Sequence, residues 1–385
     1  MIQSSLAFKG PNGGLIFLPA PENWPPASVL MSSTKQVMTT RAFELPASER
    51  LLRFLESQRV KRKHIIPLTP DASTRNYFRI PWKQGKASNV ANAVAAVYPE
   101  PFDPDFHPYL DVTRLFLDNA IPVPEIYAVD GQSGVIIQED LGDRQLFRVF
   151  EAAPDDECDQ YKERAVNLIA QIQNATNHAY ERQSIASRLA FDEPKLSWEL
   201  DFFIEHYFTS LRKETLRHAE SAELKAELND IAAELAARPR VLCHRDFHAA
   251  NLMVDQDNRL RIVDHQDARM GPVTYDLVSF LLDRRPVPPS LAELRAFRLL
   301  LLEERRLLGL EALDPDEIAT EFRLMTIQRG LKAIGTFSYQ TAVCGRGAAY
   351  EKFIEPTFFI VLQAADWLDR FPALRRMIRE RINNN

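Results

Sequence analysis

The order of apolar and polar positions indicates where folded structure begins. Residues 1–42 mix proline, glycine, serine and asparagine without apolar periodicity, which predicts a flexible N-terminal extension. From Ala47 to Gln58, leucine and phenylalanine recur at helical spacing, while Glu49 and Arg53 occupy the polar side. This pattern predicts an amphipathic helix, so we expect the first folded lobe to begin near residue 43.

Short apolar segments after this helix predict a sheet-rich lobe. We expect strands over residues 65–68, 77–80, 90–98 and 134–138, separated by turn-prone sequence, and a helix over 110–119. The pattern changes near residue 141, so the first lobe is expected to cover residues 43–141.

Long amphipathic patterns dominate the rest of the chain and predict a mostly helical second lobe over residues 142–385. Helices are expected over 155–178, 195–218, 221–237, 290–309, 316–334 and 351–371, with one short strand pair near residue 250 and a frayed end at 383–385. Together the two lobes predict an α+β fold.

Composition and charge exclude several classes of protein. The 385 residues carry 47 Lys and Arg against 53 Asp and Glu, a net charge of −6, so the basic surface of a general nucleic-acid-binding protein is missing. No apolar run reaches the roughly 18 residues that a membrane span requires, and no secretory signal core is visible. The three cysteines lack zinc-ligand spacing. We expect a cytoplasmic protein with neither a nucleic-acid nor a membrane partner, and the sequence leaves the oligomeric state open.

The segment 241–254, V-L-C-H-R-D-F-H-A-A-N-L-M-V, places a group of polar residues between apolar flanks. A turn-rich sequence and a second apolar run at 260–263 follow, which predicts a hairpin that returns Asp264 close to Asn251. An amide oxygen and a carboxylate are hard ligands that suit Mg²⁺, completed by phosphate oxygens and water. The pair therefore predicts a magnesium site.

Asp246 precedes Asn251 in the spacing H-R-D-x-x-x-x-N. This spacing is the catalytic-loop pattern of kinases, in which the aspartate accepts the proton of the attacking hydroxyl and the asparagine holds magnesium. The alternative is that these polar side chains bond their own backbone in a turn. That alternative leaves Asp264 unexplained, so phosphoryl transfer is the better interpretation.

Several segments, in order, resemble the aminoglycoside-phosphotransferase-like branch of the protein-kinase-like fold over about residues 47–375. They are T-P-D-A-S-T-R-N-Y-F-R-I at 69–80, I-I-Q-E-D-L-G-D at 136–143, H-R-D-F-H-A-A-N at 244–251, I-V-D-H-Q-D-A at 262–268 and G-P-V-T-Y-D-L-V at 271–278. Together with Q-R-G-L-K-A-I-G-T-F at 328–337, the last two are similar to bacterial anomeric kinases that phosphorylate N-acetylmuramate and N-acetylglucosamine at C1 in cell-wall recycling. The resemblance implies a small antiparallel-sheet N-lobe that binds ATP and a large helical C-lobe with the catalytic loop and the acceptor pocket.

The resemblance also implies roles for single residues. Asp246 would be the catalytic base, with Asn251 and Asp264 as Mg²⁺ ligands. The backbone of a hinge would hold the adenine of ATP, and this hinge consists of Glu139, Asp140 and Leu141.

Three further residues are expected to support the site. Asp276 resembles the family acid that braces the catalytic loop, although its place at a predicted helix start would equally suit the helix dipole. His244 and His248 match family histidines, for which a packed structural role is the expectation. His265 follows Asp264 where kinases have Phe-Gly, so no kinase-style activation switch is expected.

One family feature is missing. Protein kinases place a phosphate-pairing lysine on the third strand, but the segment 93–98, A-V-A-A-V-Y, has none. Arg75 and Arg79 are the candidate substitutes, and the Ser73 backbone N–H could approach phosphate oxygens. Lys83 and Lys86 are expected to be surface residues.

The charge of the C-terminal part of the chain helps to predict which substrate accepts the phosphoryl group. Residues 285–385 hold 15 Lys and Arg against 13 Asp and Glu, which disfavours a pocket for a polycation and favours the lactyl carboxylate of muramate. Arg329 and Lys332 share one helix face and are candidate sugar contacts, although a solvated face explains them equally well. Asp267 either contacts sugar hydroxyls or closes a local turn. The alternative functions are a kinase for an aminoglycoside, choline or homoserine, or a nucleotide-binding pseudokinase.

Overall fold

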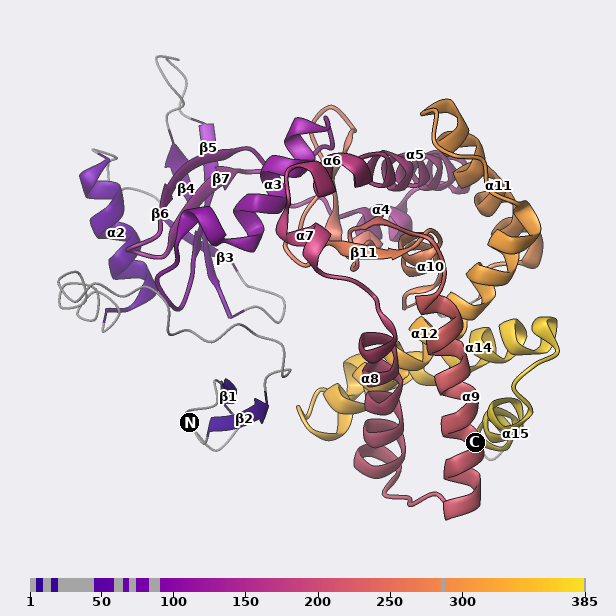
Figure 1. The fold of residues 1–385 in the computed structure, drawn as a ribbon. Helices are drawn as coiled ribbons and strands as arrows, with labels where there is room; N and C mark the ends of the chain where they lie inside the picture. The colour runs from indigo at the N-terminus through magenta and orange to yellow at the C-terminus, as the bar shows by residue number, and fades with distance from the viewer. Residues whose placement is uncertain are drawn as a thin grey trace.

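The structure is a computed structural model that describes residues 5–9, 15–19, 45–58, 65–68, 74–82, 91–284 and 288–383. Figure 1 shows a lobe built on a β-sheet beside a larger lobe of helices. This arrangement confirms the α+β class, with a small antiparallel sheet followed by a mostly helical remainder. Among the helices in these ranges, none is long and apolar enough to cross a membrane.

The N-lobe sheet has the strand order β3-β4-β5-β7-β6, and every neighbouring pair is antiparallel. Its strands in chain order are β3 (Ile66–Leu68), β4 (Asn76–Trp82), β5 (Ala91–Val97), β6 (Ile126–Asp130) and β7 (Val135–Glu139). The sequence did not predict β6. This edge strand is short and follows Pro122 and Pro124, so its apolar pattern is weak.

Helix α2 (Ala47–Ser57) covers one face of this sheet. Its apolar stripe of Leu51, Phe54 and Leu55 is buried against strand residues such as Ile80 and Val97, as the amphipathic pattern predicts. Helix α3 (Pro108–Asp118) lies between the sheet and the second lobe in Figure 1. The sheet ends at Glu139, and the next helix begins at residue 146, so the expected lobe boundary at residue 141 falls in the connection between them.

The C-lobe is built mainly from helices. They are α4 (Leu146–Ala152), α5 (Asp155–Asn174), α6 (Thr176–Glu181), α7 (Ile185–Arg188), α8 (Glu193–Phe203), a π-helical continuation (Ile204–Arg212), α9 (His218–Ala236), α10 (Tyr275–Leu282), α11 (Leu291–Leu307), α12 (Pro315–Ala342), α13 (Gly347–Tyr350), α14 (Ile354–Leu368) and α15 (Pro372–Asn383). Two short antiparallel pairs interrupt them. β8 (Arg240–Cys243) pairs with β11 (Arg269–Pro272), and β9 (Leu252–Val254) pairs with β10 (Leu260–Ile262).

Local sequence explains where several helices begin and end. The Asp192, Ser290 and Asp314 side chains accept hydrogen bonds from the first-turn N–H groups of α8, α11 and α12. The helix predicted to reach residue 218 ends at Arg212 because Lys213 adopts a left-handed conformation. The helix predicted over 351–371 ends at Leu368, because Asp369 adopts a left-handed conformation with a φ of +48°.

Helix α12 is central to the C-lobe, where it packs against α8, α14 and the π-helical segment. A Cβ atom at Gly335 would lie 2.8 Å from the Cα atom of Phe203, so this glycine permits the close approach of α12 to α8. The approach also brings Gln328 of α12 within 2.9 Å of the Glu199 carboxylate of α8.

Two strands lie within the predicted N-terminal extension. Strands β1 (Ser5–Lys9) and β2 (Leu15–Pro19) form an antiparallel hairpin within the stretch 1–42, which the sequence analysis assigned entirely to a flexible extension. Two short apolar runs pair here across a Pro-Asn-Gly-Gly sequence. Both runs are too short to produce a clear periodicity, which is why the sequence analysis did not recognise them.

Candidate active site

The loop between β8 and β9 carries Asp246, and a buried carboxylate fixes its shape. Asp276, in the first turn of α10, accepts hydrogen bonds from the backbone N–H groups of His244 at 2.6 Å and Arg245 at 3.0 Å. Burial raises the pKa of Asp276, while the two N–H bonds favour its charged form. Asp276 therefore braces the loop directly instead of only complementing the dipole of α10.

A guanidinium group holds the same loop from the other side. Arg245 has a φ of +85°, and its carbonyl oxygen accepts a hydrogen bond from Arg329 Nη1 at 3.0 Å. Arg329 also donates to the Ser279 hydroxyl at 2.8 Å and lies over the Tyr275 ring. The sequence offered Arg329 as either a candidate sugar contact or part of a solvated helix face. Its burial contradicts the solvated face, these contacts make it a support of the loop, and a sugar contact stays a prediction.

Asp246 itself lies in a strongly electropositive environment. Its side chain is 28% exposed, and Arg245 Nη1 lies 3.8 Å from Asp246 Oδ2. Burial alone would favour the protonated acid, but the positive charges of Lys332, Arg245 and Arg329 outweigh this effect and hold the pKa of Asp246 well below its usual range. The carboxylate is therefore ionised and able to accept a hydrogen bond.

Asn251 and Asp264 meet where the hairpin prediction placed them. Strands β9 and β10 pair Leu252 with Ile262, and the Val263 N–H donates to the Asn251 carbonyl at 3.0 Å. The Asn251 Nδ2 group donates to the Asp246 carbonyl oxygen at 2.9 Å, which leaves the amide oxygen available as a ligand. Asp264 has a φ of +63°, and its carboxylate is 43% exposed.

This donor set fits Mg²⁺ better than a metal enclosed by protein ligands. Within the described ranges, no three His, Cys, Asp or Glu residues group closely enough to hold an ion. One carboxylate and one amide oxygen leave most coordination positions to phosphate oxygens and water, as Mg²⁺ prefers. Asn251 and Asp264 are thus the residues that could hold magnesium beside a nucleotide.

The histidines of the loop have structural partners. His244 is buried and donates its Nε2–H to the Val263 carbonyl at 3.1 Å, while His248 Nε2 lies 3.5 Å from Asn251 Nδ2. Burial lowers the pKa of both rings, so they are neutral. His265 bonds the Thr113 hydroxyl of α3 at 2.7 Å, which ties the segment after Asp264 to that helix.

The N-lobe contributes one arginine to the site and another to the lobe junction. Arg75 Nη2 lies 3.5 Å from Asp264 Oδ1, whereas β5, at the position of the third kinase strand, carries no lysine. Arg79 forms ion pairs with Asp140 at 2.6 Å and Asp143 at 2.8 Å. Ser73, the remaining residue predicted to contact phosphate, lies outside the described residues, as do Lys83 and Lys86.

The predicted hinge is held by side chains from both lobes. The Glu139 carboxylate, at the end of β7, pairs with Arg261 of β10 at 2.5 Å. The Asp140 carboxylate accepts hydrogen bonds from Arg79 Nε at 2.6 Å and from the Gly142 N–H at 3.0 Å. Leu141 follows and is half-buried. The connection is therefore tied to the β-hairpin that leads to Asp264.

A cavity of about 300 Å³ connects these groups. Asp246, Asn251 and Asp264 line one part of it, and Lys332 and Thr336 of α12 line another. Phe337 and Tyr350 add aromatic surface, and Asp283 and Arg284 complete the polar part of that wall. The cavity thus joins the residues that could hold a metal to the polar and aromatic side chains of α12 and its neighbours.

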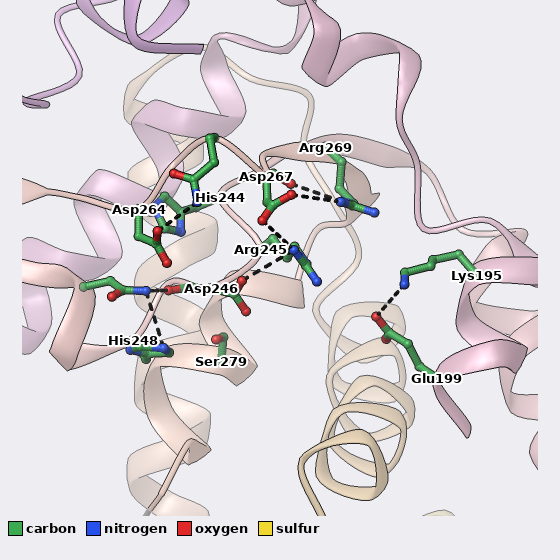
Figure 2. A network of polar contacts seen from close by, with 12 residues as sticks. Lys195, Glu199, His244, Arg245, Asp246, His248, Asp264, Asp267, Arg269 and Ser279 are labelled. Carbon is green, nitrogen blue, oxygen red and sulfur yellow. Dashed lines mark hydrogen bonds and ion pairs between the residues drawn. The ribbon is translucent and has the colours of Figure 1, made fainter. Parts of the chain in front are cut away.

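Sequence reasoning missed two residues on α8. Glu199 is 1% exposed, accepts a hydrogen bond from Gln328 at 2.9 Å, and lies 3.6 Å from the Lys195 ammonium. Burial opposes its ionisation, but Lys332 and Lys195 lower the pKa of Glu199 overall. Figure 2 shows Lys195 and Glu199 pointing toward the side of the loop that carries Arg245. Nothing in the local sequence of α8 marks them, because only the packing of α8 on α12 brings them here.

Asp267 is held by neighbouring arginines. Its Oδ2 lies 2.9 Å from Arg245 Nη1, and its carbonyl oxygen accepts a hydrogen bond from Arg269 Nε at 3.1 Å, as Figure 2 shows. The carboxylate therefore orients the arginine that precedes Asp246. A contact from Asp267 to a sugar hydroxyl stays a prediction.

Comparison with known proteins places the chain among small-molecule kinases. The sequence model of the phosphotransferase enzyme family matches residues 64–310. An N-acetylmuramate/N-acetylglucosamine kinase of Pseudomonas aeruginosa is 29% identical over 308 residues, 78% of this chain and 83% of the relative. A Neisseria meningitidis protein of the same name is 27% identical over 274 residues, 70% of this chain and 76% of the relative.

A solved structure confirms the fold expected from the sequence. A choline/ethanolamine kinase family protein of Mesorhizobium loti superposes with a TM-score of 0.54 at 14% identity, over 86% of this chain and 100% of that chain. This likeness concerns the protein-kinase-like fold alone.

Proposed function

This chain belongs to the phosphotransferase enzyme family, and we propose that it transfers the γ-phosphoryl group of Mg·ATP to the anomeric hydroxyl of N-acetylmuramate or N-acetylglucosamine. As a member of this family it is a phosphotransferase that acts on an alcohol group, with ATP as co-substrate. One arrangement supports the finer proposal: the Asp246 carboxylate lines the same cavity as Asn251, Asp264 and the α12 wall. A cytoplasmic role in cell-wall recycling is part of the proposal.

Asp246 is the proposed catalytic residue. Its carboxylate accepts a hydrogen bond from the C1 hydroxyl and directs a lone pair of that oxygen at the γ-phosphorus. The new bond joins the sugar oxygen to phosphorus, the bond between the γ-phosphorus and the β,γ-bridging oxygen breaks, and the hydroxyl proton passes to Asp246. Because phosphoryl transfer proceeds through a loose transition state, positioning provides most of the rate.

The acidity of the acceptor hydroxyl affects the demand on Asp246. A carboxylate surrounded by Lys332, Arg245 and Arg329 is a weak base, so it takes a proton late in the reaction. An anomeric hydroxyl is more acidic than the other hydroxyls of a sugar and therefore makes a smaller demand on such a base.

Asn251 and Asp264 are the proposed ligands of Mg²⁺, through their amide and carboxylate oxygens. When bound, the metal would neutralise the negative charge that develops on the phosphate oxygens during phosphoryl transfer. Asp276 and Arg329 hold the loop that carries Asp246. The protein thus fixes the oxygen ligands and the base relative to each other before substrates bind.

The nucleotide is proposed to lie between the lobes. The backbone of Glu139, Asp140 and Leu141 would hold adenine, with Ser73 and Arg75 on the phosphate side. The contact of Arg75 with Asp264 supports its role as the substitute for the missing strand lysine. Arg79 is engaged by Asp140 and Asp143, so we assign it to the hinge and not to direct phosphate contact.

A substrate panel tests this proposal. Release of ADP from Mg·ATP is measured with N-acetylmuramate, N-acetylglucosamine, kanamycin, choline and buffer alone, using the wild type and Asp246→Asn. We expect turnover of the amino sugars, its loss in Asp246→Asn, and a C1 phosphate identified by phosphorus NMR. Turnover of kanamycin or choline alone would overturn the assigned acceptor, and phosphate on another hydroxyl would overturn the anomeric assignment.

A further inference from the structure

The α12 wall of the cavity differs in charge from the part beside Asn251 and Asp264. Among the residues that the structure describes, three cations line the cavity, namely Arg284, Arg329 and Lys332. Carboxylates at Asp246, Asp264 and Asp283 face the same space. Which cation is available to a ligand depends on the contacts that each already makes.

Two of the three cations are engaged by protein groups. Arg329 donates to the Arg245 carbonyl at 3.0 Å and to the Ser279 hydroxyl at 2.8 Å. Arg284 Nε lies 3.6 Å from the Asp283 carboxylate, and its Cζ atom lies 5.8 Å from the centre of the Tyr350 ring. Arg284 is thus paired with a carboxylate, whereas Arg329 is fixed by two neutral groups and, at 9% exposed, is less accessible to a ligand than the half-buried Lys332.

Lys332 combines greater exposure than Arg329 with the lack of a paired carboxylate among the described residues. In the part of the chain that the structure describes, no carboxylate oxygen lies within 4.0 Å of its ammonium group. Burial lowers the pKa of Lys332, with Asp246 acting in the opposite direction. A half-buried ammonium without a carboxylate in contact gains more from an incoming anion than an already paired group does.

The surroundings of Lys332 suit a sugar. Tyr350 is half-buried, and the ring of Phe337, which is 3% exposed, lies with its centre 6.1 Å from that of Tyr350. Both rings line the cavity and offer a small apolar surface to a pyranose ring. Thr336, one helical turn after Lys332, adds a hydroxyl to the same wall. A cation, a hydroxyl and an aromatic surface therefore line one compartment next to Asp246.

We infer that Lys332 binds a carboxylate of the acceptor and so makes the enzyme discriminate in favour of N-acetylmuramate over N-acetylglucosamine. The inference rests on the proposed function and assigns specificity within it. The two sugars share the C1 hydroxyl and the N-acetyl group, and they differ only in the lactyl ether that carries the carboxylate. A residue that acts on the shared reaction centre affects both sugars alike, whereas a carboxylate-binding residue affects one.

The test compares kcat/KM for the two sugars in the wild type, Lys332→Met and Lys332→Arg. In Lys332→Met we expect the value for N-acetylmuramate to fall about 10- to 100-fold further than the value for N-acetylglucosamine. Lys332→Arg should keep much of the preference, because the charge remains. Lys225→Met removes a half-exposed lysine of α9 and serves as the matched control. Because both sugars are measured on each variant, a partly unfolded preparation leaves the ratio unchanged.

A neutral substrate gives a second comparison. The carboxamide of N-acetylmuramate keeps the size of the lactyl group but lacks its charge, so its kcat/KM with the wild type should be low. The Lys332→Met substitution should lower kcat/KM for this carboxamide no more than it lowers kcat/KM for N-acetylglucosamine. An equal fall for both natural sugars in Lys332→Met would overturn the inference and assign Lys332 to the reaction centre. Turnover of both sugars by the wild type with no preference would overturn the inference while the proposed function stands. Turnover of neither sugar overturns both.

Discussion

Arg75 of the N-lobe lies with its Nη2 atom 3.5 Å from the Oδ1 atom of Asp264 in the C-lobe. The guanidinium group is positioned by two aromatic rings, because its Cζ atom lies 5.6 Å from the ring centres of Tyr77 and Tyr98. This contact brings an N-lobe cation to the proposed metal ligand, where β5 provides no lysine. Arg75 thus connects the sheet lobe with the proposed phosphate-binding region.

We expect Arg75→Met to lower kcat/KM for ATP by about 10- to 100-fold, because one charge-assisted contact to phosphate is lost. Arg75→Lys should have an intermediate effect. Steady-state kinetics with ATP as the varied substrate provide the measurement, and Arg53→Met, an exposed substitution on α2, is the control. Unchanged ATP kinetics in Arg75→Met would rule out Arg75 as the substitute cation.

Asp246→Asn should reduce kcat by about 10²- to 10⁴-fold, since the amide cannot accept the hydroxyl proton. Binding of Mg·ATP should change little, because Asn251 and Asp264 are unaltered. Kinetics together with nucleotide binding measured by calorimetry separate the two effects. Retention of near wild-type turnover would remove Asp246 from the reaction.

The activity should disappear with EDTA and return with added Mg²⁺. Asp264→Asn replaces a charged ligand with a neutral one, so we expect a higher Mg²⁺ concentration at half-maximal rate. A magnesium titration at fixed ATP measures this shift. An identical titration curve for Asp264→Asn and the wild type would contradict a direct role of Asp264 in metal binding.

Asp276→Ala should destabilise the protein by about 2 kcal/mol, because two buried backbone N–H groups lose their acceptor. The brace also shapes the loop, so kcat should fall as well. Urea unfolding and steady-state kinetics of the same preparation measure both quantities. If stability fell while kcat stayed unchanged, Asp276 would support the fold without positioning Asp246.

His107 should make stability depend on pH. Burial, together with the charge of Arg75, lowers the pKa of His107 to about 4 from 6.5. The unfolded chain therefore binds a proton between these values that the folded chain does not, so stability is full above the unfolded pKa and falls as the pH decreases through this window. In His107→Phe the loss of Tm between about pH 7.5 and about pH 5 should be smaller, because the phenyl ring does not titrate. Parallel losses in both proteins would show that His107 does not contribute.

The catalytic loop was predictable because its chemistry is local. Asp246 and Asn251 lie on one short loop, and a single hairpin brings Asp264 back to them, so residue spacing contains most of the geometry. The fold class followed in the same way, from the change of apolar period near residue 141.

The burial of individual side chains and the residues they pack against could not be predicted from the sequence. Arg329 and Lys332 share a helix face and both line the cavity, yet Arg329 also donates to the Arg245 carbonyl and so supports the loop. Glu199 reaches the site only because α8 packs closely on α12 at Gly335. Arg79 follows the predicted phosphate turn but is engaged by carboxylates at the lobe junction. These differences depend on tertiary contacts, and the periodicity of a single sequence does not reveal such contacts.

The left-handed backbone at Arg245 and Asp264 has a consequence for protein engineering. Each non-glycine residue in this conformation costs folding free energy of about 1 to 3 kcal/mol. At Arg245 the Asp276 carboxylate and the Arg329 guanidinium offset that cost by clamping the N–H and the carbonyl. Directed evolution for heat resistance would therefore reward substitutions that relax these two positions, and the selected variants would gain melting temperature while losing turnover.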